Sequence, residues 1–135
     1  MEIRERNVNE SHLKEVVRLV RNRECMINLD VADVIEVMVG KKGVMYEARQ
    51  EPGEDNKTFM RRCFNELSNK QTVKGCGYML LSIGASAEEP LTMEDVDTIS
   101  EFFFSFEKVE SKWGFRNNEE GVGMTLMLLC TNKLG

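Results

Sequence analysis

Histidine, proline and long apolar runs are scarce in this sequence of 135 residues, which contains two prolines and a single histidine, His12. One histidine leaves almost nothing for histidine-based acid–base chemistry or for a zinc site. The longest apolar run lies between Met124 and Cys130, far short of the ~20 residues that span a bilayer. The charged N-terminus is followed by no apolar signal segment. We therefore expect a cytoplasmic protein with no membrane partner.

Positive charge and paired cysteines are lacking as well. Acidic residues outnumber basic ones by 23 to 18, and the resulting net charge of −5 argues against nucleic acid as a partner. No cysteine belongs to a C-x-x-C pair, so we expect reduced, buried thiols and neither a disulfide framework nor a metal site. The cysteines are Cys25, Cys63, Cys76 and Cys130.

The sequence also lacks the motifs that hold nucleotides or activate a nucleophile. Neither G-x-x-x-x-G-K-[ST] nor G-x-G-x-x-G occurs, so no glycine-rich backbone cradle for phosphates is expected. There is no G-x-S-x-G elbow, and without a partner histidine a serine or cysteine nucleophile has no base. We therefore predict no bound cofactor and no enzymatic activity of the chain alone.

Apolar residues recur at helical spacing in some stretches and at strand spacing in others. The expected helices cover residues 11–24, 31–39, 56–68 and 92–109, and the expected strands cover 44–50, 75–83, 112–116 and 122–130. This order predicts one α+β domain with a four-stranded mixed sheet packed by helices. We expect an irregular arm and a leading helix over residues 1–24 and the main domain over residues 25–135.

Two helix starts carry capping signals. Ser11 can cap the first helix, and Thr92 with Asp95 three residues later resembles a capping box. The helix that follows Thr92 is expected to be the main core element. The side chains that we expect to point inward from it are Val96, Ile99, Phe102, Phe103, Phe106 and Val109.

An N-x-D-x-x-D pattern, formed by Asn28, Asp30 and Asp33, lies at the junction of the first two expected helices. One interpretation is structural: Asp30 caps the second helix and Asp33 occupies its first turn, where a carboxylate is favourable against the helix dipole. The other interpretation is functional, with at least one carboxylate exposed to a partner; of the two, we expect Asp33 to be the exposed one.

The sequence around this pattern resembles the C-terminal domain of the bacterial tubulin homologue FtsZ. Residues 25–34, CMINLDVADV, and the Val37-Met38 pair are similar to that family's apolar stretch, N-x-D-x-A-D-V loop and helix ending in V-M. Similar motifs follow in the same order at residues 53–55, 77–83, 91–96, 113–114 and 124–131. The resemblance covers about residues 22–132, and residues 11–24 fall where the family has the end of its long central helix.

This resemblance implies a role that can be exercised only in trans. It covers the C-terminal half of FtsZ and the connecting helix, without the glycine-rich signature that binds GTP. In the family, this loop of one subunit inserts into the nucleotide site of the next and places carboxylates near the attacking water. Carried over, Asp30 and Asp33 would be those carboxylates and Asn28 the polar contact beside them.

Two functions are therefore expected. The first is a stand-alone interaction module that docks onto a nucleotide-binding FtsZ-type GTPase, in cell division or in the regulation of filaments. The alternative is a self-associating scaffold or a small-molecule-binding domain that keeps only the fold, because a fold does not specify a function.

Overall fold

The computed structural model describes residues 3–20, 25–27, 31–106, 108–119 and 121–134. They form five α-helices, one short 3₁₀ turn and six strands. The helices are α1 (Leu13–Val20), α2 (Val31–Met38), α3 (Asn56–Ser68), α4 (Gln71–Lys74) and α5 (Met93–Phe104), and the 3₁₀ turn is Glu10–His12. The strands are β1 (Arg4–Asn9), β2 (Cys25–Ile27), β3 (Lys41–Arg49), β4 (Tyr78–Ala85), β5 (Glu110–Asn117) and β6 (Thr125–Lys133).

The six strands form one mixed sheet in the order β1-β3-β6-β4-β5-β2. Among the described strands only β4 and β5 pair in parallel; α5 lies in the connection between them, and the other pairings are antiparallel. The α+β prediction is confirmed, but the count of four strands is wrong. The predicted irregular arm contains β1, an edge strand in which only Val8 is buried, so it shows no apolar alternation. The second additional strand, β2, is three residues long.

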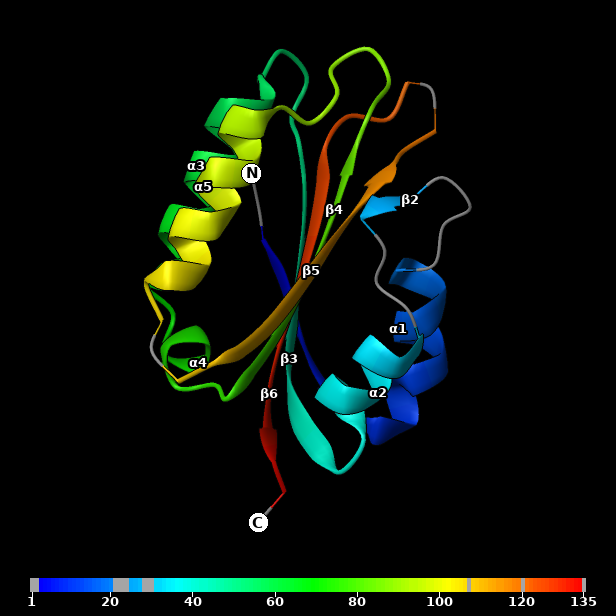
Figure 1. The fold of residues 1–135 in the computed structure, drawn as a ribbon, viewed down its shortest axis with the longest axis vertical. Coiled ribbons are helices and arrows are strands. Elements are labelled where there is room, and N and C mark those ends of the chain that lie inside the picture. Colours follow the sequence, from blue (N-terminus) through cyan, green and yellow to red (C-terminus); the bar gives the residue numbers. More distant parts are fainter. Residues whose placement is uncertain (1–2, 21–24, 28–30, 107, 120, 135) are drawn as a thin grey trace.

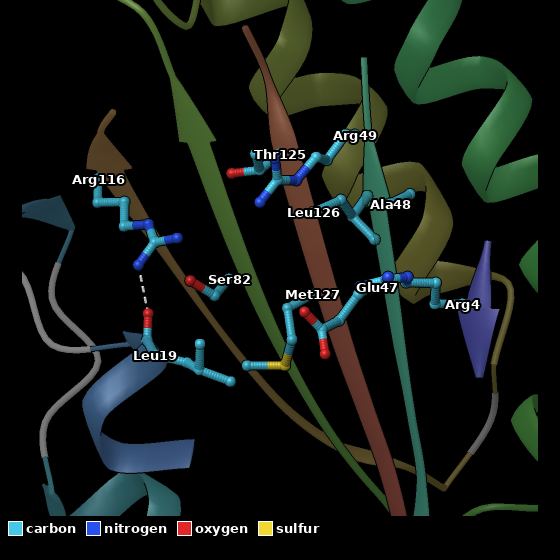
Figure 2. A pocket seen from close by; sticks show the side chains of 10 residues that line it. All are labelled: Arg4, Leu19, Glu47, Ala48, Arg49, Ser82, Arg116, Thr125, Leu126 and Met127. Atoms are coloured by element: carbon cyan, nitrogen blue, oxygen red, sulfur yellow. Dashed lines mark hydrogen bonds between the residues drawn. The ribbon is translucent and has the colours of Figure 1, made fainter. Parts of the chain in front are cut away.

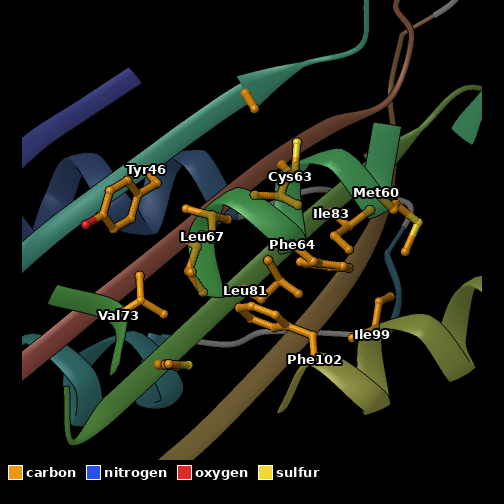
Figure 3. Close-up of a cluster of buried hydrophobic side chains, with 14 of the residues drawn as sticks. Tyr46, Met60, Cys63, Phe64, Leu67, Val73, Leu81, Ile83, Ile99 and Phe102 are labelled. Atoms are coloured by element: carbon orange, nitrogen blue, oxygen red, sulfur yellow. The ribbon is translucent and has the colours of Figure 1, made fainter. Parts of the chain in front are cut away.

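The two faces of the sheet are covered differently. Helices α3 and α5 lie on one face, whereas α1 and α2 lie on the other (Figure 1). The core on the first face is built from α3, α5 and alternate residues of the central strands (Figure 3). Its fully buried side chains include Tyr46, Phe59, Cys63, Leu81 and Ile83.

Helix α5 begins where the sequence predicts. The Thr92 hydroxyl accepts a hydrogen bond from the Asp95 N–H, and the Asp95 carboxylate accepts one from the Thr92 N–H, which confirms the capping box. Its buried apolar side chains are Ile99 and Phe102, while Phe103 is only partly buried. The expectation that Val96, Phe103 and Phe106 are as fully buried as Ile99 is therefore wrong.

The first helical segment starts earlier than predicted. Asn9, not Ser11, is the N-cap of the 3₁₀ turn that leads into α1, because its side-chain oxygen accepts from the Ser11 N–H at 2.9 Å. His12 completes the cap, since its Nδ1 accepts from the Asn9 N–H at 3.0 Å. The predicted domain boundary at residue 24 lies outside the described residues.

A second core lies between the sheet and the helices α1 and α2. It joins buried side chains of both helices to strands of the sheet, and its members are Val8, Val16, Val20, Val34, Val37, Met38, Met45, Leu80, Met127 and Leu129. A buried hydrogen bond of 2.6 Å from the Thr131 hydroxyl to the Val37 carbonyl fixes α2 to β6. The position of α2 on the sheet is therefore determined by both packing and a polar contact.

Candidate functional site

Of the three residues singled out in the sequence, one belongs to the described structure. Asn28 and Asp30 lie outside the described residues, so their predicted roles remain predictions. Asp33 lies in the first turn of α2. The candidate site is therefore built on α2 and on β5, whose Lys112 side chain pairs with Asp33.

Asp33 is held by Lys112, which reaches it from β5. The Lys112 Nζ lies 3.1 Å from Asp33 Oδ1 and 3.0 Å from Glu36 Oε2. The Asp33 side chain is 24% exposed, so it is half-buried and paired, whereas the sequence predicted an exposed carboxylate. The hydrogen bonds to Glu36 and Asp33 raise the pKa of Lys112 above its usual value, because both carboxylates favour the charged ammonium.

The outer side of α2 carries a stripe of exposed apolar side chains. Val31, Ile35 and Val39 follow one another at helical spacing and are 46%, 43% and 42% exposed. Single exposed apolar residues are common, but three at this spacing, two in α2 and one directly after its last residue, suit a partner. We call these three residues the α2 stripe. Sequence reasoning missed it because α2 is apolar on more than one side, and only the structure separates the buried side from the exposed one.

The end of α2 is anchored to its surroundings. Gly40 adopts a positive φ of 71°, a conformation that favours glycine, and its N–H donates to Glu10 Oε1 at 2.7 Å. The ammonium of Lys41 donates to the Glu36 carbonyl at 2.6 Å and lies 4.5 Å from the centre of the Tyr78 ring. The α2 stripe is therefore displayed from a fixed element.

The chemistry that this surface offers is that of binding. It combines apolar area with two carboxylates that share one lysine, and no set of three or more histidine, cysteine or acidic side chains in the described residues could hold a metal. Three described cysteines, Cys63, Cys76 and Cys130, are buried, as predicted for them, and are free thiols in this structure. No helix in the described residues has the length and apolarity needed to cross a membrane.

Comparison with known proteins extends the resemblance to three dimensions. No family model and no curated protein matches the sequence. Solved structures do match. One is the GDP-form protofilament of TubZ from Bacillus thuringiensis serovar israelensis, with a TM-score of 0.61 and 9% identity over 90% of this chain and 36% of that one. The fold of this chain is therefore similar to that of a part of TubZ.

Two further structures agree. The empty FtsZ dimer of M. jannaschii has a TM-score of 0.58 and 18% identity, and covers 90% of this chain and 36% of that chain. The GTPγS-form protofilament of TubZ has a TM-score of 0.58 and 9% identity, with 90% and 34% covered. This chain spans about a third of the length of these proteins. A match to one third of these proteins is consistent with the sequence resemblance, which covers the C-terminal domain of FtsZ and not its GTP-binding half.

Proposed function

We propose that this protein is an interaction module with the FtsZ-like fold, which docks through the outer side of α2 onto a nucleotide-binding FtsZ-type partner. The α2 stripe carries the proposal. Three aliphatic side chains are exposed by more than 40%: Val31 lies within the segment whose sequence resembles the FtsZ subunit-contacting loop, and Ile35 and Val39 follow it. Their burial on docking would provide the apolar core that specific interfaces have.

The charged groups beside the stripe give the interface a polar edge. Asp33, Glu36 and Lys112 form one ion-paired group, and such edges contribute more to specificity than to affinity. Under this proposal Asp33 is one of the carboxylates that approach a nucleotide held by the partner, together with Asp30, while Asn28 makes a polar contact. The chain alone is then no enzyme and hydrolyses no nucleotide.

The structures with similar folds support a role in assembly. They are an FtsZ dimer and protofilaments of TubZ, so this fold occurs in proteins that associate subunit to subunit. We infer that the present chain participates in the same kind of contact, in cell division or in the regulation of filaments. The alternative partner for the α2 stripe is a second copy of this chain.

The direct test mixes the protein with an FtsZ-type GTPase and GTP, and follows phosphate release and light scattering. We expect the wild type to change both signals while releasing no phosphate by itself. Ile35→Asp places a charge in the middle of the α2 stripe and should weaken the effect about tenfold or more, because an unpaired charge is costly in an apolar contact. Ile35 is exposed in the free chain, so this variant should fold.

The matched control is Met93→Asp. Met93 is 76% exposed at the start of α5, on the opposite face of the sheet, so this variant should keep the full effect. If the wild type leaves both signals unchanged, the proposed partner is wrong. Sedimentation velocity then tests the second occupant: a dimer that Ile35→Asp dissociates and Met93→Asp does not would assign the stripe to a second copy.

A further inference from the structure

The sheet face that carries α1 and α2 also holds a cavity of about 500 Å³, lined by described residues. The cavity is lined by strands β1, β3, β4, β5 and β6 and by the end of α1 (Figure 2). Its volume falls within the range of ~300–1,000 Å³ typical of small-molecule sites. None of the three α2 stripe residues lines it, so the cavity is separate from the proposed docking surface.

The register of the sheet places two arginines at opposite ends of one row in this cavity. Arg49 pairs with Thr125, Thr125 pairs with Gly84, and Gly84 pairs with Arg116 across four adjacent strands. Residues in register point to the same face of a sheet. Figure 2 shows the guanidinium groups of Arg49 and Arg116 extending toward each other across the cavity. Both guanidinium groups therefore point into the same cavity.

The donors of these two arginines are largely unused. Among the described residues, the Arg49 side chain makes no hydrogen bond or ion pair. Arg116 donates from Nη1 to the Leu19 carbonyl, and its Nε is buried with no acceptor among the described residues. Buried donors in native proteins nearly always have a partner. An acceptor that enters from outside would supply it.

The charge of the lining favours an anion. Three arginines and one carboxylate line the cavity, so its described lining is positive in a chain whose net charge is −5. The one carboxylate, Glu47, lies in register with Arg4 and so offsets that arginine. Among the described lining residues no further carboxylate faces Arg49 and Arg116, and a cleft lined by one sign of charge concentrates ions of the other sign.

We propose that this cavity binds a small molecule through an oxyanion, a phosphate or a carboxylate, held between Arg49 and Arg116. The planar fork of a guanidinium group matches both oxyanions with two parallel hydrogen bonds. The hydroxyls of Ser82 and Thr125, which also line the cavity, are neutral donors beneath the anion. Glu47 also lines the cavity and repels negative charge. The rest of the ligand is therefore expected to lie away from Glu47.

Isothermal titration calorimetry with two probes tests this site. Pyrophosphate and citrate are titrated separately into the full chain at constant ionic strength, and we expect saturable binding of at least one of them. The probe that binds more tightly shows whether the site prefers a phosphate or a carboxylate. Arg49→Gln should weaken that binding about tenfold or more, since a charged hydrogen-bond donor is lost. Glu47→Gln should strengthen it. Arg61→Gln, an exposed change on α3 at the other face, is the control and should bind as the wild type does.

Two results would overturn the proposal. One is the absence of saturable binding for both probes. The other is binding by Arg49→Gln that equals the wild type, which would mean that the anion lies elsewhere. Arg116→Gln also removes the contact with the Leu19 carbonyl and can affect folding. Arg49→Gln is therefore the decisive variant, because its side chain makes no such contact among the described residues.

Discussion

Lys112 connects β5 to the first turns of α2 by pairing with two carboxylates. Because these side chains remain partly exposed, water screens their charges and the ion pair contributes little to the free energy of unfolding. Asp33→Ala also leaves Lys112 paired with Glu36. We therefore expect the melting temperature of Asp33→Ala to lie within about 2–3 °C of the wild type, measured by circular dichroism. A much larger loss of stability would show that Asp33 is a structural residue and would weaken its proposed role toward a partner.

Helix α5 shows how strongly one ring can matter within an element. Phe102 is 5% exposed and stacks on Phe64 with ring centres 4.5 Å apart, while Phe106 meets it edge-on at 5.2 Å. Phe102→Ala should cost about 3–5 kcal/mol, a large part of the stability of a small domain. Phe104→Ala, at a position 85% exposed, should stay within about 0.5 kcal/mol of the wild type. Urea unfolding of the two variants measures the contrast, and equal midpoints would contradict this assignment of the buried face.

Local sequence signals predicted the elements whose buried residues follow a clear period. The predicted helix over residues 56–68 has the bounds of α3, and the Thr92 cap is present. The strands at the sheet centre were predicted because they alternate or are continuously apolar. Strand β1 and helix α4 were missed because β1 is a polar edge strand and α4 has four residues. Such elements form through tertiary pairing, which single-sequence periodicity does not record.

The candidate sites were predictable to different degrees. The sequence resemblance drew attention to Asp33, but its partner Lys112 comes from a distant strand. Arg49 and Arg116 meet in one cavity only through the register of four strands. Neither arginine belongs to a short motif, so no local pattern could bring them together. Long-range pairing determined both sites.

At the scale of the whole molecule, buried acidic groups make the fold sensitive to alkaline pH. Burial raises the pKa of the Cys63 thiol from 9.0 to about 12 and that of the Tyr46 phenol from 10.0 to about 12. In the unfolded chain these groups lose their protons near pH 9 and 10, so the unfolded state binds fewer protons across this range. Stability is therefore fully retained below about pH 9 and declines as the pH rises toward 12.

Tyr46→Phe should reduce this decline in stability, because it removes one of the two groups that titrate. The loss of the contact with the Thr72 hydroxyl should cost little, since Thr72 is exposed and its hydroxyl can bind water instead. Cys63→Ala should reduce it as well, from a lower starting stability. Urea midpoints measured between pH 8 and pH 12 give the slopes. If both variants lose stability with pH as steeply as the wild type, the alkaline transition originates in other groups. Cys130 is then the residue to substitute next, because its hydrogen bond with Cys76 and its burial also raise its pKa.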